Sequence, residues 1–264
     1  MNDALPAPFD VRLMNLTATV VFLGCAAMLV ASAGWWALRH PAFALGSIVV
    51  EGKFTHNNAV TLRANIAHKL DGNFFTVSLQ RAQAAFQDVP WVRRASVQRE
   101  FPNRLRVTLE EHVPVALWGP ESGSALVNDH GEVFEANVAD LDNDDLPRLT
   151  GPEGHAPEVL AMYRTLAPVF QPLDMGLEQL EESGRGSWRA TLDGGAVVEI
   201  GTGTPAELLA RTRRFTRTLT QVAGKYGRRA DALQTADLRH ADGYALRLAG
   251  VTTVTPEAAA RKKK

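Results

Sequence analysis

The 264-residue sequence has a single cysteine, Cys25, and almost no net charge. One thiol excludes an intramolecular disulfide and a zinc site built from cysteines, because both need at least two thiols. Lys and Arg together number 28 against 29 Asp and Glu, which gives a formal charge of −1. Because no basic excess is available to neutralise a nucleic-acid backbone, we expect no nucleic-acid partner.

The sequence also lacks the common catalytic and metal-binding motifs. It contains no H-E-x-x-H, G-x-S-x-G, P-loop or C-x-x-C pattern. Asp140, Asp142 and Asp144 resemble the start of a calcium loop, but Asp145 stands where that loop needs glycine and Gly151 where it needs the closing glutamate. We therefore predict no metal site and no cofactor.

Charged residues are missing from the whole stretch 13–38. Its 26 residues would form a helix about 39 Å long, enough to cross a hydrocarbon core of roughly 30 Å. Trp35 and Trp36 lie at one end, where amphipathic rings favour the headgroup region. We predict a membrane-spanning helix over 13–38; the alternatives are a buried core helix and a signal peptide cleaved near Ala31, Ser32 and Ala33.

Charge alone does not orient this helix. Arg12 lies on one side and Arg39 and Lys53 lie on the other, so neither side has the clear excess of basic residues that the positive-inside rule needs to orient a helix. A tail of 12 residues precedes the helix, and most of the chain follows it. From these lengths we expect the short tail over 1–12 to be cytoplasmic and the bulk of the chain to lie across the membrane.

After the membrane segment, the pattern predicts a small α+β domain. A strand, two helices and two strands are expected, in that order, at 43–52, 57–70, 78–87, 91–99 and 104–111. In the last of these segments Leu105, Val107 and Leu109 alternate with polar residues, which indicates one buried and one wet face.

Short strands dominate the sequence from residue 113 onwards. We predict strands at 113–118, 125–127, 133–134, 146–149, 177–182, 188–192, 196–200, 232–239 and 244–249, and helices at 157–170 and 205–226. An Asp-Gly pair at 242–243 predicts a tight turn between the last two strands. If this hairpin ends a sheet, its outer strand is a template for a partner strand, and Arg239 would offer a bidentate fork to a carboxylate. Residues 251–264 are expected to be a disordered tail.

Several segments together resemble the FtsQ/DivIB family of bacterial cell-division proteins. They include Val50-Glu51-Gly52, Val89-Pro90-Trp91-Val92, Phe101-Pro102, Glu111-His112-Val113-Pro114, Asp129-His130-Gly131, Leu149-Thr150-Gly151, Ser187-Trp188 and Ala236-Asp237-Leu238-Arg239. The similarity covers about residues 10–250 in the same order. It implies an α+β fold with a single membrane helix over 13–38 and a POTRA domain of β-α-α-β-β order over 43–112. A β domain of mainly antiparallel sheet with flanking helices would follow over 113–250.

This resemblance implies an essential scaffold of the cell-division machinery, the divisome, at the septum. Its members have a cytoplasmic N-terminus, a single pass through the inner membrane and a periplasmic bulk, without catalytic activity or a small-molecule substrate. The implied partners are FtsB and FtsL, bound through the β domain, together with FtsK, FtsW and FtsI, and the implied role includes control of septal peptidoglycan synthesis. From the residues alone, the alternative is a membrane-anchored binding module or an unrecognised periplasmic hydrolase.

The resemblance also implies two sets of binding residues. A segment of FtsB would add a strand at the end of the β domain and place acidic groups against arginines, at positions corresponding to Arg185, Arg239, His240, Asp242 and Tyr244. His240 stands where the family usually has an aromatic residue, so either His240 or Tyr244 takes that place. Recruitment through an exposed face of the POTRA domain would use Arg94, Val97 and Arg99.

Overall fold

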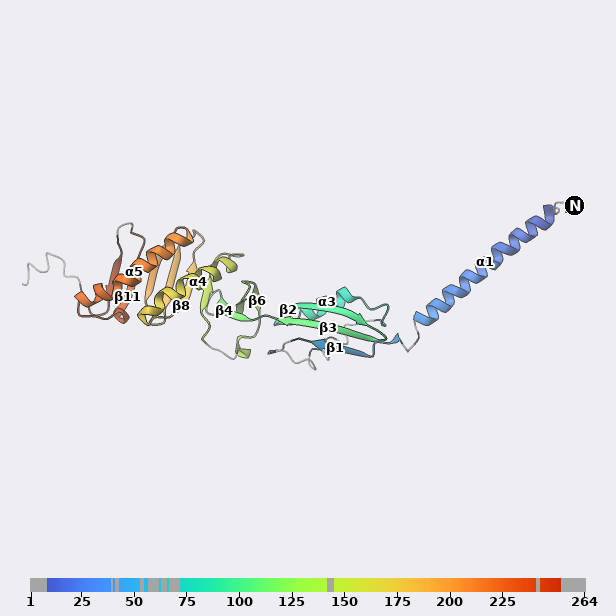
Figure 1. Ribbon diagram of the computed structural model, residues 1–264, viewed down its shortest axis with the longest axis horizontal. Coiled ribbons are helices and arrows are strands. Elements are labelled where there is room, and N and C mark those ends of the chain that lie inside the picture. Colours follow the sequence, from blue (N-terminus) through green and yellow to red (C-terminus); the bar gives the residue numbers. More distant parts are fainter. Residues whose placement is uncertain are drawn as a thin grey trace, which may run out of the picture. The chain divides into compact units, whose positions relative to one another are not determined.

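The computed structural model describes residues 9–38, 40, 43–52, 55–56, 62, 66, 72–141, 145–240 and 243–252. The chain divides into two compact units, Met1–Glu111 and His112–Lys264. The N-terminal unit contains helix α1 (Phe9–Leu38), strand β1 (Ser47–Glu51), helix α3 (Leu79–Gln87) and strands β2 (Val92–Glu100) and β3 (Arg104–Glu111) (Figure 1). Most of the helix predicted over 57–70, Asp242 and the tail from residue 253 lie outside the described residues.

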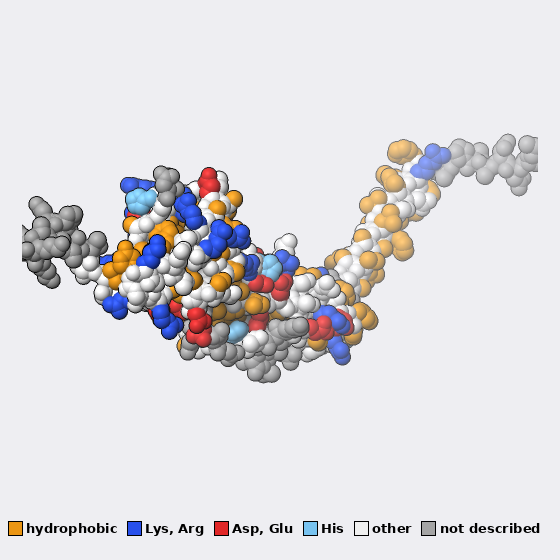
Figure 2. All heavy atoms as spheres, turned by 60° about the vertical axis from the view of Figure 1, so that its left-hand side comes forward, with side chains coloured by type: hydrophobic (Ala, Val, Ile, Leu, Met, Phe, Trp, Pro, Cys, Tyr) orange, Lys and Arg blue, Asp and Glu red, His pale blue; other side chains and the backbone are white. Residues whose placement is uncertain are grey.

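Helix α1 is apolar and exposed along its length. The span Phe9–Trp36 has a mean hydropathy of 2.1 and none of it is buried, and Figure 2 shows hydrophobic side chains along the helix. The hydroxyls of Thr17 and Thr19 donate to carbonyls one turn earlier in the helix, which satisfies them without water. By length and composition α1 can cross a membrane, and it begins at residue 9 rather than at the predicted residue 13.

Strands β1, β2 and β3 form a three-stranded sheet in the order β1-β3-β2. Strand β1 runs parallel to β3, and β2 runs antiparallel to it. The alternation predicted for β3 is confirmed, because Leu105, Val107 and Leu109 are buried. The predicted strand over 43–52 starts too early: β1 begins at Ser47, and before it Ala44 forms an isolated bridge with Asn73 in the loop before α3.

Helix α3 closes the core of this sheet. Its N-cap is Ser78, whose hydroxyl accepts a hydrogen bond from the backbone N–H of Arg81 at 3.3 Å. Ala82, Ala85 and Phe86 are buried against the strands. The helix therefore matches the predicted 78–87, and its capping serine and four-residue apolar spacing are the local reasons for it.

The C-terminal unit is built on one sheet of nine strands and two helices. In chain order these are β4 (Pro114–Trp118), β5 (Ala125–Asn128), β6 (Val133–Glu135), β7 (Arg148–Thr150), α4 (Ala156–Phe170), β8 (Leu177–Glu182), β9 (Trp188–Leu192), β10 (Val197–Gly201), α5 (Pro205–Lys225), β11 (Leu233–Asp237) and β12 (Ala245–Leu248). The strand order is β12-β11-β10-β9-β8-β7-β4-β5-β6. Five of its strand pairs are antiparallel and three are parallel, so the prediction of a mainly antiparallel sheet is confirmed.

Helices α4 and α5 cover one face of this sheet (Figure 1). Leu180, Ala190 and Val198 lie side by side on neighbouring strands and are fully buried in the core beneath the helices. Helix α5 begins with a capping box, in which the side chain of Thr204 accepts from the backbone of Glu207 and the Glu207 carboxylate accepts from the backbone of Thr204. These hydrogen bonds lower the pKa of the Glu207 carboxyl. The result is a two-layer α/β arrangement whose other face stays polar.

The predicted turn at Asp242-Gly243 lies partly outside the described residues, and the two strands predicted around it, 232–239 and 244–249, are shorter than expected. Strand β11 ends at Asp237 and β12 begins at Ala245, so a longer connection separates them. Leu238 is buried, and its backbone N–H donates to the carbonyl of Glu199 at 2.8 Å. This hydrogen bond keeps the chain beside β10 for one residue beyond the end of β11. The backbone N–H of Arg239 then donates to the Asp237 side chain at 3.0 Å, and this local turn ends the strand before the Asp-Gly pair is reached.

Candidate partner-binding edge of the C-terminal sheet

Strand β12 is the outer strand at one end of the nine-stranded sheet. It pairs with β11 on one side, and no strand among the described residues pairs with its other side. The backbone N–H of Ala249, just after β12, donates inward to the carbonyl of Ala232. Because inward and outward groups alternate along a strand, the N–H and C=O groups of Leu246 and the N–H of Leu248 lie on the outer side, while the carbonyl of Leu248 accepts from the backbone N–H of Val251 at 3.2 Å. This edge can accept a further strand.

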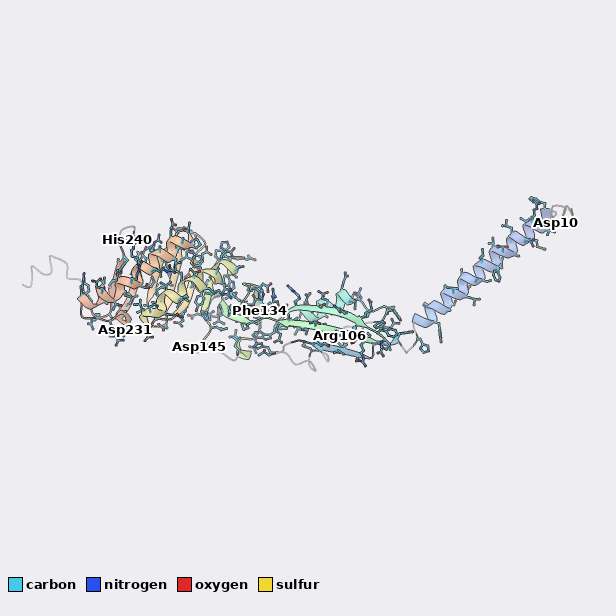
Figure 3. The ribbon with its side chains drawn as sticks, viewed as in Figure 1. Asp10, Arg106, Phe134, Asp145, Asp231 and His240 are labelled. Carbon is cyan, nitrogen blue, oxygen red and sulfur yellow. The ribbon has the colours of Figure 1, made fainter. Side chains whose placement is uncertain are left out.

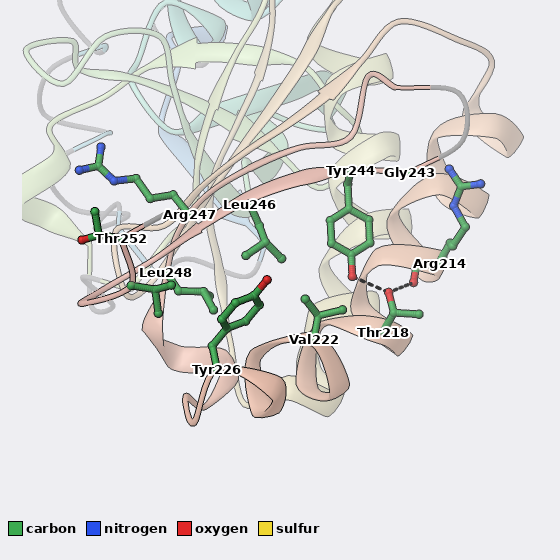
Figure 4. Close-up of a pocket in the computed structure, with 11 residues that line it drawn as sticks. Arg214, Thr218, Val222, Tyr226, Gly243, Tyr244, Leu246, Arg247, Leu248 and Thr252 are labelled. Carbon is green, nitrogen blue, oxygen red and sulfur yellow. Dashed lines mark hydrogen bonds between the residues drawn. The ribbon is translucent and has the colours of Figure 1, made fainter. Parts of the chain in front are cut away.

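A groove of about 820 Å³ runs between α5 and β12, and we call it the α5–β12 groove (Figure 4). Tyr244, Leu246 and Leu248 line it from the strand side, and Val222 and Tyr226 line it from the helix. Tyr226 is 59% exposed, so an apolar wall is open to solvent beside the free edge. The groove therefore offers space for every second side chain of a strand added to β12.

Tyr244 fixes the start of β12 to helix α5. Its hydroxyl lies 2.7 Å from the hydroxyl of Thr218 (Figure 4). Its ring packs edge-on against Phe215, with the ring centroids 5.0 Å apart. The Thr218 hydroxyl also donates to the carbonyl of Arg214. Since that proton is used, the Tyr244 hydroxyl is the donor between the two residues. Tyr244 is half-buried, so its first role in this chain is to hold the edge strand in place.

Arg239 follows the end of β11 and is paired within the chain. Its Nε and Nη2 donate to the two carboxylate oxygens of Asp237 at 2.9 and 2.6 Å. These hydrogen bonds are the main reason why the pKa of Asp237 falls to about 2, and the carboxylate in turn raises the pKa of Arg239. One side of the guanidinium is thus occupied, and its Nη1 makes no hydrogen bond to the residues that the structure describes.

Gly201 allows this arrangement. It adopts φ +91°, and a Cβ atom there would lie 2.8 Å from the Cγ of Arg239 and 3.2 Å from Nη1 of Arg211. Sequence reasoning missed both Gly201 and Asp237 as parts of the site. Asp237 could have been found, because it precedes Arg239 by two and an aspartate side chain often accepts a hydrogen bond from the backbone N–H two residues later. The role of Gly201 depends on β10 and β11 being neighbours, which the sequence does not indicate.

Arg185 lies at the same end of the sheet as Arg239. It is exposed in the turn between β8 and β9. Trp188, at the start of β9, is paired with Gly201 at the end of β10, and β10 runs parallel to β11 toward Arg239. Within the described residues, no carboxylate lies within ion-pair distance of Arg185.

Of the two remaining predicted FtsB-binding residues, the structure describes His240 but not Asp242. His240 is exposed directly after Arg239, and Figure 3 shows it at the opposite end of β11 from Asp231. Asp242 lies outside the described residues. No group of three or more His, Cys, Asp or Glu side chains in the described part of the chain is placed to hold a metal ion. The prediction that no metal or cofactor is used stays a prediction.

One of the three residues predicted for the recruitment face of the N-terminal unit is buried. Val97 is 9% exposed and packs in the core of the three-stranded sheet, so it is not on the surface. Its neighbour Arg94 is exposed. Arg99 is exposed as well, but it donates to the carbonyls of Phe74 and Val77 at 2.7 and 2.8 Å and so holds the preceding loop. Strand β2 is the outer strand of the order β1-β3-β2, and no strand among the described residues pairs with its other side.

Comparison with known proteins covers both units. Residues 43–112 match the model of the FtsQ-type POTRA domain, and residues 116–239 match the model of the C-terminal region of cell-division protein FtsQ/DivIB. A cell-division protein FtsQ of Burkholderia pseudomallei is 40% identical over 247 residues, which is 93% of this chain and 96% of that protein. The Bordetella pertussis protein of the same name is 39% identical over 272 residues, and that of Thiomonas arsenitoxydans is 34% identical over 269; each alignment covers 96% or more of both chains.

Proposed function

The chain belongs to the FtsQ/DivIB family of cell-division proteins, and from this premise we propose that it is a non-catalytic scaffold of the divisome. Helix α1 would cross the inner membrane with residues 1–12 in the cytoplasm, and the POTRA and β domains would lie in the periplasm at the septum. The β domain would bind FtsB, and FtsL with it, and through them the protein would help to control septal peptidoglycan synthesis.

This proposal is supported by strand β12, whose outer side pairs with no described strand and lies beside the partly apolar α5–β12 groove. An extended segment of FtsB would form backbone hydrogen bonds with the outward N–H and C=O groups of Leu246 and with the outward N–H of Leu248. Its alternate side chains would enter the α5–β12 groove, while the others would lie over the polar face of the sheet. Main-chain hydrogen bonds would supply affinity, and the groove would favour apolar side chains at the positions of the FtsB segment that enter it.

Two arginines at one end of the sheet would fix the register of the added strand. Arg185 has no carboxylate partner in the described part of the chain, and the Nη1 side of Arg239 is available beyond its pair with Asp237. Acidic groups of the partner would pair with both guanidiniums, because charge-assisted hydrogen bonds at a partly desolvated edge give orientation as well as energy. Asp237 would act as a positioning residue that holds the Arg239 fork toward the partner.

The POTRA domain would provide the second contact. We propose that recruitment uses the exposed side of the POTRA domain at β2, where Arg94 is exposed, and that FtsK is a further partner of the protein. The synthase pair of FtsW and FtsI would be reached through the assembled complex. Because Val97 is buried, substitutions there would act through folding and not through partner contact.

Charge reversal at Arg239 tests the FtsB contact. In the full chain reconstituted in lipid nanodiscs, Arg239→Glu should weaken binding of the periplasmic part of FtsB by about 2 kcal/mol or more, roughly 30-fold, because a charge-assisted pair becomes a repulsion. Arg213→Glu is the matched control, since Arg213 is exposed on α5 and has no ion pair among the described residues. Equal binding by the two variants would contradict the proposed site. Normal division after depletion of the protein would contradict the divisome role.

A further inference from the structure

Four phenylalanines gather at one end of the POTRA domain, and we call them the phenylalanine cluster: Phe43, Phe74, Phe75 and Phe101. The ring centroids of Phe43 and Phe75 are 5.0 Å apart, those of Phe74 and Phe75 are 5.2 Å apart, and those of Phe74 and Phe101 are 6.4 Å apart. The backbone N–H of Phe74 donates to the carbonyl of Phe43 at 2.9 Å. The cluster thus joins the start of the domain, the loop before α3 and the β2–β3 turn.

Two of these rings face solvent although the backbone around them is well held. Phe101 is 78% exposed and Phe75 is 46% exposed, whereas Phe74 is 6% exposed and supports them. The loop that carries Phe75 is fixed by Arg99, which donates to three of its carbonyls, and by Asn73, whose side chain accepts from the backbone N–H groups of Phe75 and Thr76. Neighbouring exposed aromatic rings on an ordered loop mark a surface for an apolar or interfacial partner.

The chain itself keeps this cluster close to the membrane. Phe43 comes five residues after Leu38, the last residue of α1. Five extended residues reach at most about 18 Å, so the backbone of Phe43 lies within this distance of the end of α1 whatever the angle between helix and domain. Phe75 contacts Phe43 directly, and Phe101 follows through Phe74. Trp35 and Trp36, which are 60% and 64% exposed, mark the same end of the helix and are residues typical of the headgroup region.

From this tether and this exposure we infer that the phenylalanine cluster is a lipid-contact site. Phe75 and Phe101 insert into the headgroup layer of the bilayer that α1 crosses, and they dock the POTRA domain on the membrane surface. Phenylalanine rings gain free energy in this layer, since they leave water without needing a hydrogen-bond partner. The inference rests on α1 as a membrane span and does not depend on FtsB.

Contact must be measured locally, because α1 holds the chain in the bilayer in any case. The wild-type full chain, with ring-labelled phenylalanine, is placed in nanodiscs of phosphatidylethanolamine and phosphatidylglycerol that carry a nitroxide lipid at headgroup depth. The ring signals of Phe75 and Phe101 should relax at least about threefold faster than those of the buried Phe86 and Phe215, because the headgroup layer is only roughly 5–8 Å thick. Equal relaxation of all four rings would overturn the inference.

A paired substitution separates docking from mere proximity. Phe75→Ser with Phe101→Ser should lower the nitroxide effect on the backbone amide of Asn103 in the β2–β3 turn, because the domain then leaves the surface. Tyr226→Ser, which removes an equally exposed ring from the β domain, should leave that amide unchanged. An unchanged Asn103 signal in the double variant would overturn the inference. The inference would also be overturned if the faster relaxation of the two rings appeared only with added FtsB or at high protein density, since this would show a protein contact.

Discussion

Replacing Asp237 with asparagine should remove the ion pair that orders Arg239 at the partner-binding edge. In the folded protein the pKa of Asp237 falls from 3.8 to about 2, chiefly because Arg239 donates two hydrogen bonds to the carboxylate. A carboxyl group whose pKa is lower in the folded state than in the unfolded state stabilises the fold when the pH lies above the pKa of the unfolded state. We therefore expect this contribution to be complete above about pH 4 and to disappear as the pH falls through about 2.

The size of this contribution follows from the geometry. A change of nearly two pKa units corresponds to at most about 2.4 kcal/mol. The Arg239 side chain is 59% exposed and that of Asp237 is 27% exposed, so water screens the pair and about 1 kcal/mol remains. Asp237→Asn should thus lower the free energy of unfolding by about 1 kcal/mol near pH 6 and by almost nothing near pH 2.

Two measurements check this reasoning. A pH titration of the carboxyl carbon by NMR should give a pKa of about 2 for Asp237, and Arg239→Gln should return it to near 3.8. Urea unfolding followed at β11 should show the pH-dependent loss in Asp237→Asn. A wild-type pKa near 3.8, or a loss of stability that is the same at both pH values, would refute the pairing.

Three further substitutions test the same edge. Gly201→Ala should destabilise the fold by about 1 kcal/mol or more, because alanine is strained at φ +91° and its Cβ would meet Arg239, and it should weaken FtsB binding in titration calorimetry. Tyr244→Phe and Thr218→Ala should each cost about 1 kcal/mol in denaturant unfolding, and the double variant should cost less than their sum, since both remove one hydrogen bond. Thr204→Ala should cost about 1 kcal/mol by the same assay, because it breaks the capping box of α5, and should leave partner affinity unchanged.

Local patterns were enough for most elements of this fold. Strands β8 and β9 have the predicted bounds of 177–182 and 188–192, because short alternating runs separated by a Ser-Gly turn specify a hairpin without help from the rest of the chain. Helix α5 begins at the predicted residue 205, where Thr204 and Pro205 provide the capping hydroxyl and the fixed first φ. These signals are carried by residues that are neighbours in sequence.

Features that depend on contacts between distant segments were not predictable in the same way. The Asp-Gly pair at 242–243 looks like a hairpin turn, but the hydrogen bond from Leu238 to Glu199 on β10 decides where β11 ends. On β2 the buried Val97 lies between the polar residues Ser96 and Gln98, and its pairing with the buried Val107 of β3 shows that its face points inward.

The most direct test of the central claim is amide hydrogen exchange along the sheet edges. In the full chain, addition of FtsB should slow exchange at the outward amides of Leu246 and Leu248 by about tenfold or more, because the added strand gives them backbone partners. The amides of β6, at the opposite edge of the same sheet, should exchange at an unchanged rate. Protection at β6 or β2 with none at β12 would contradict the account.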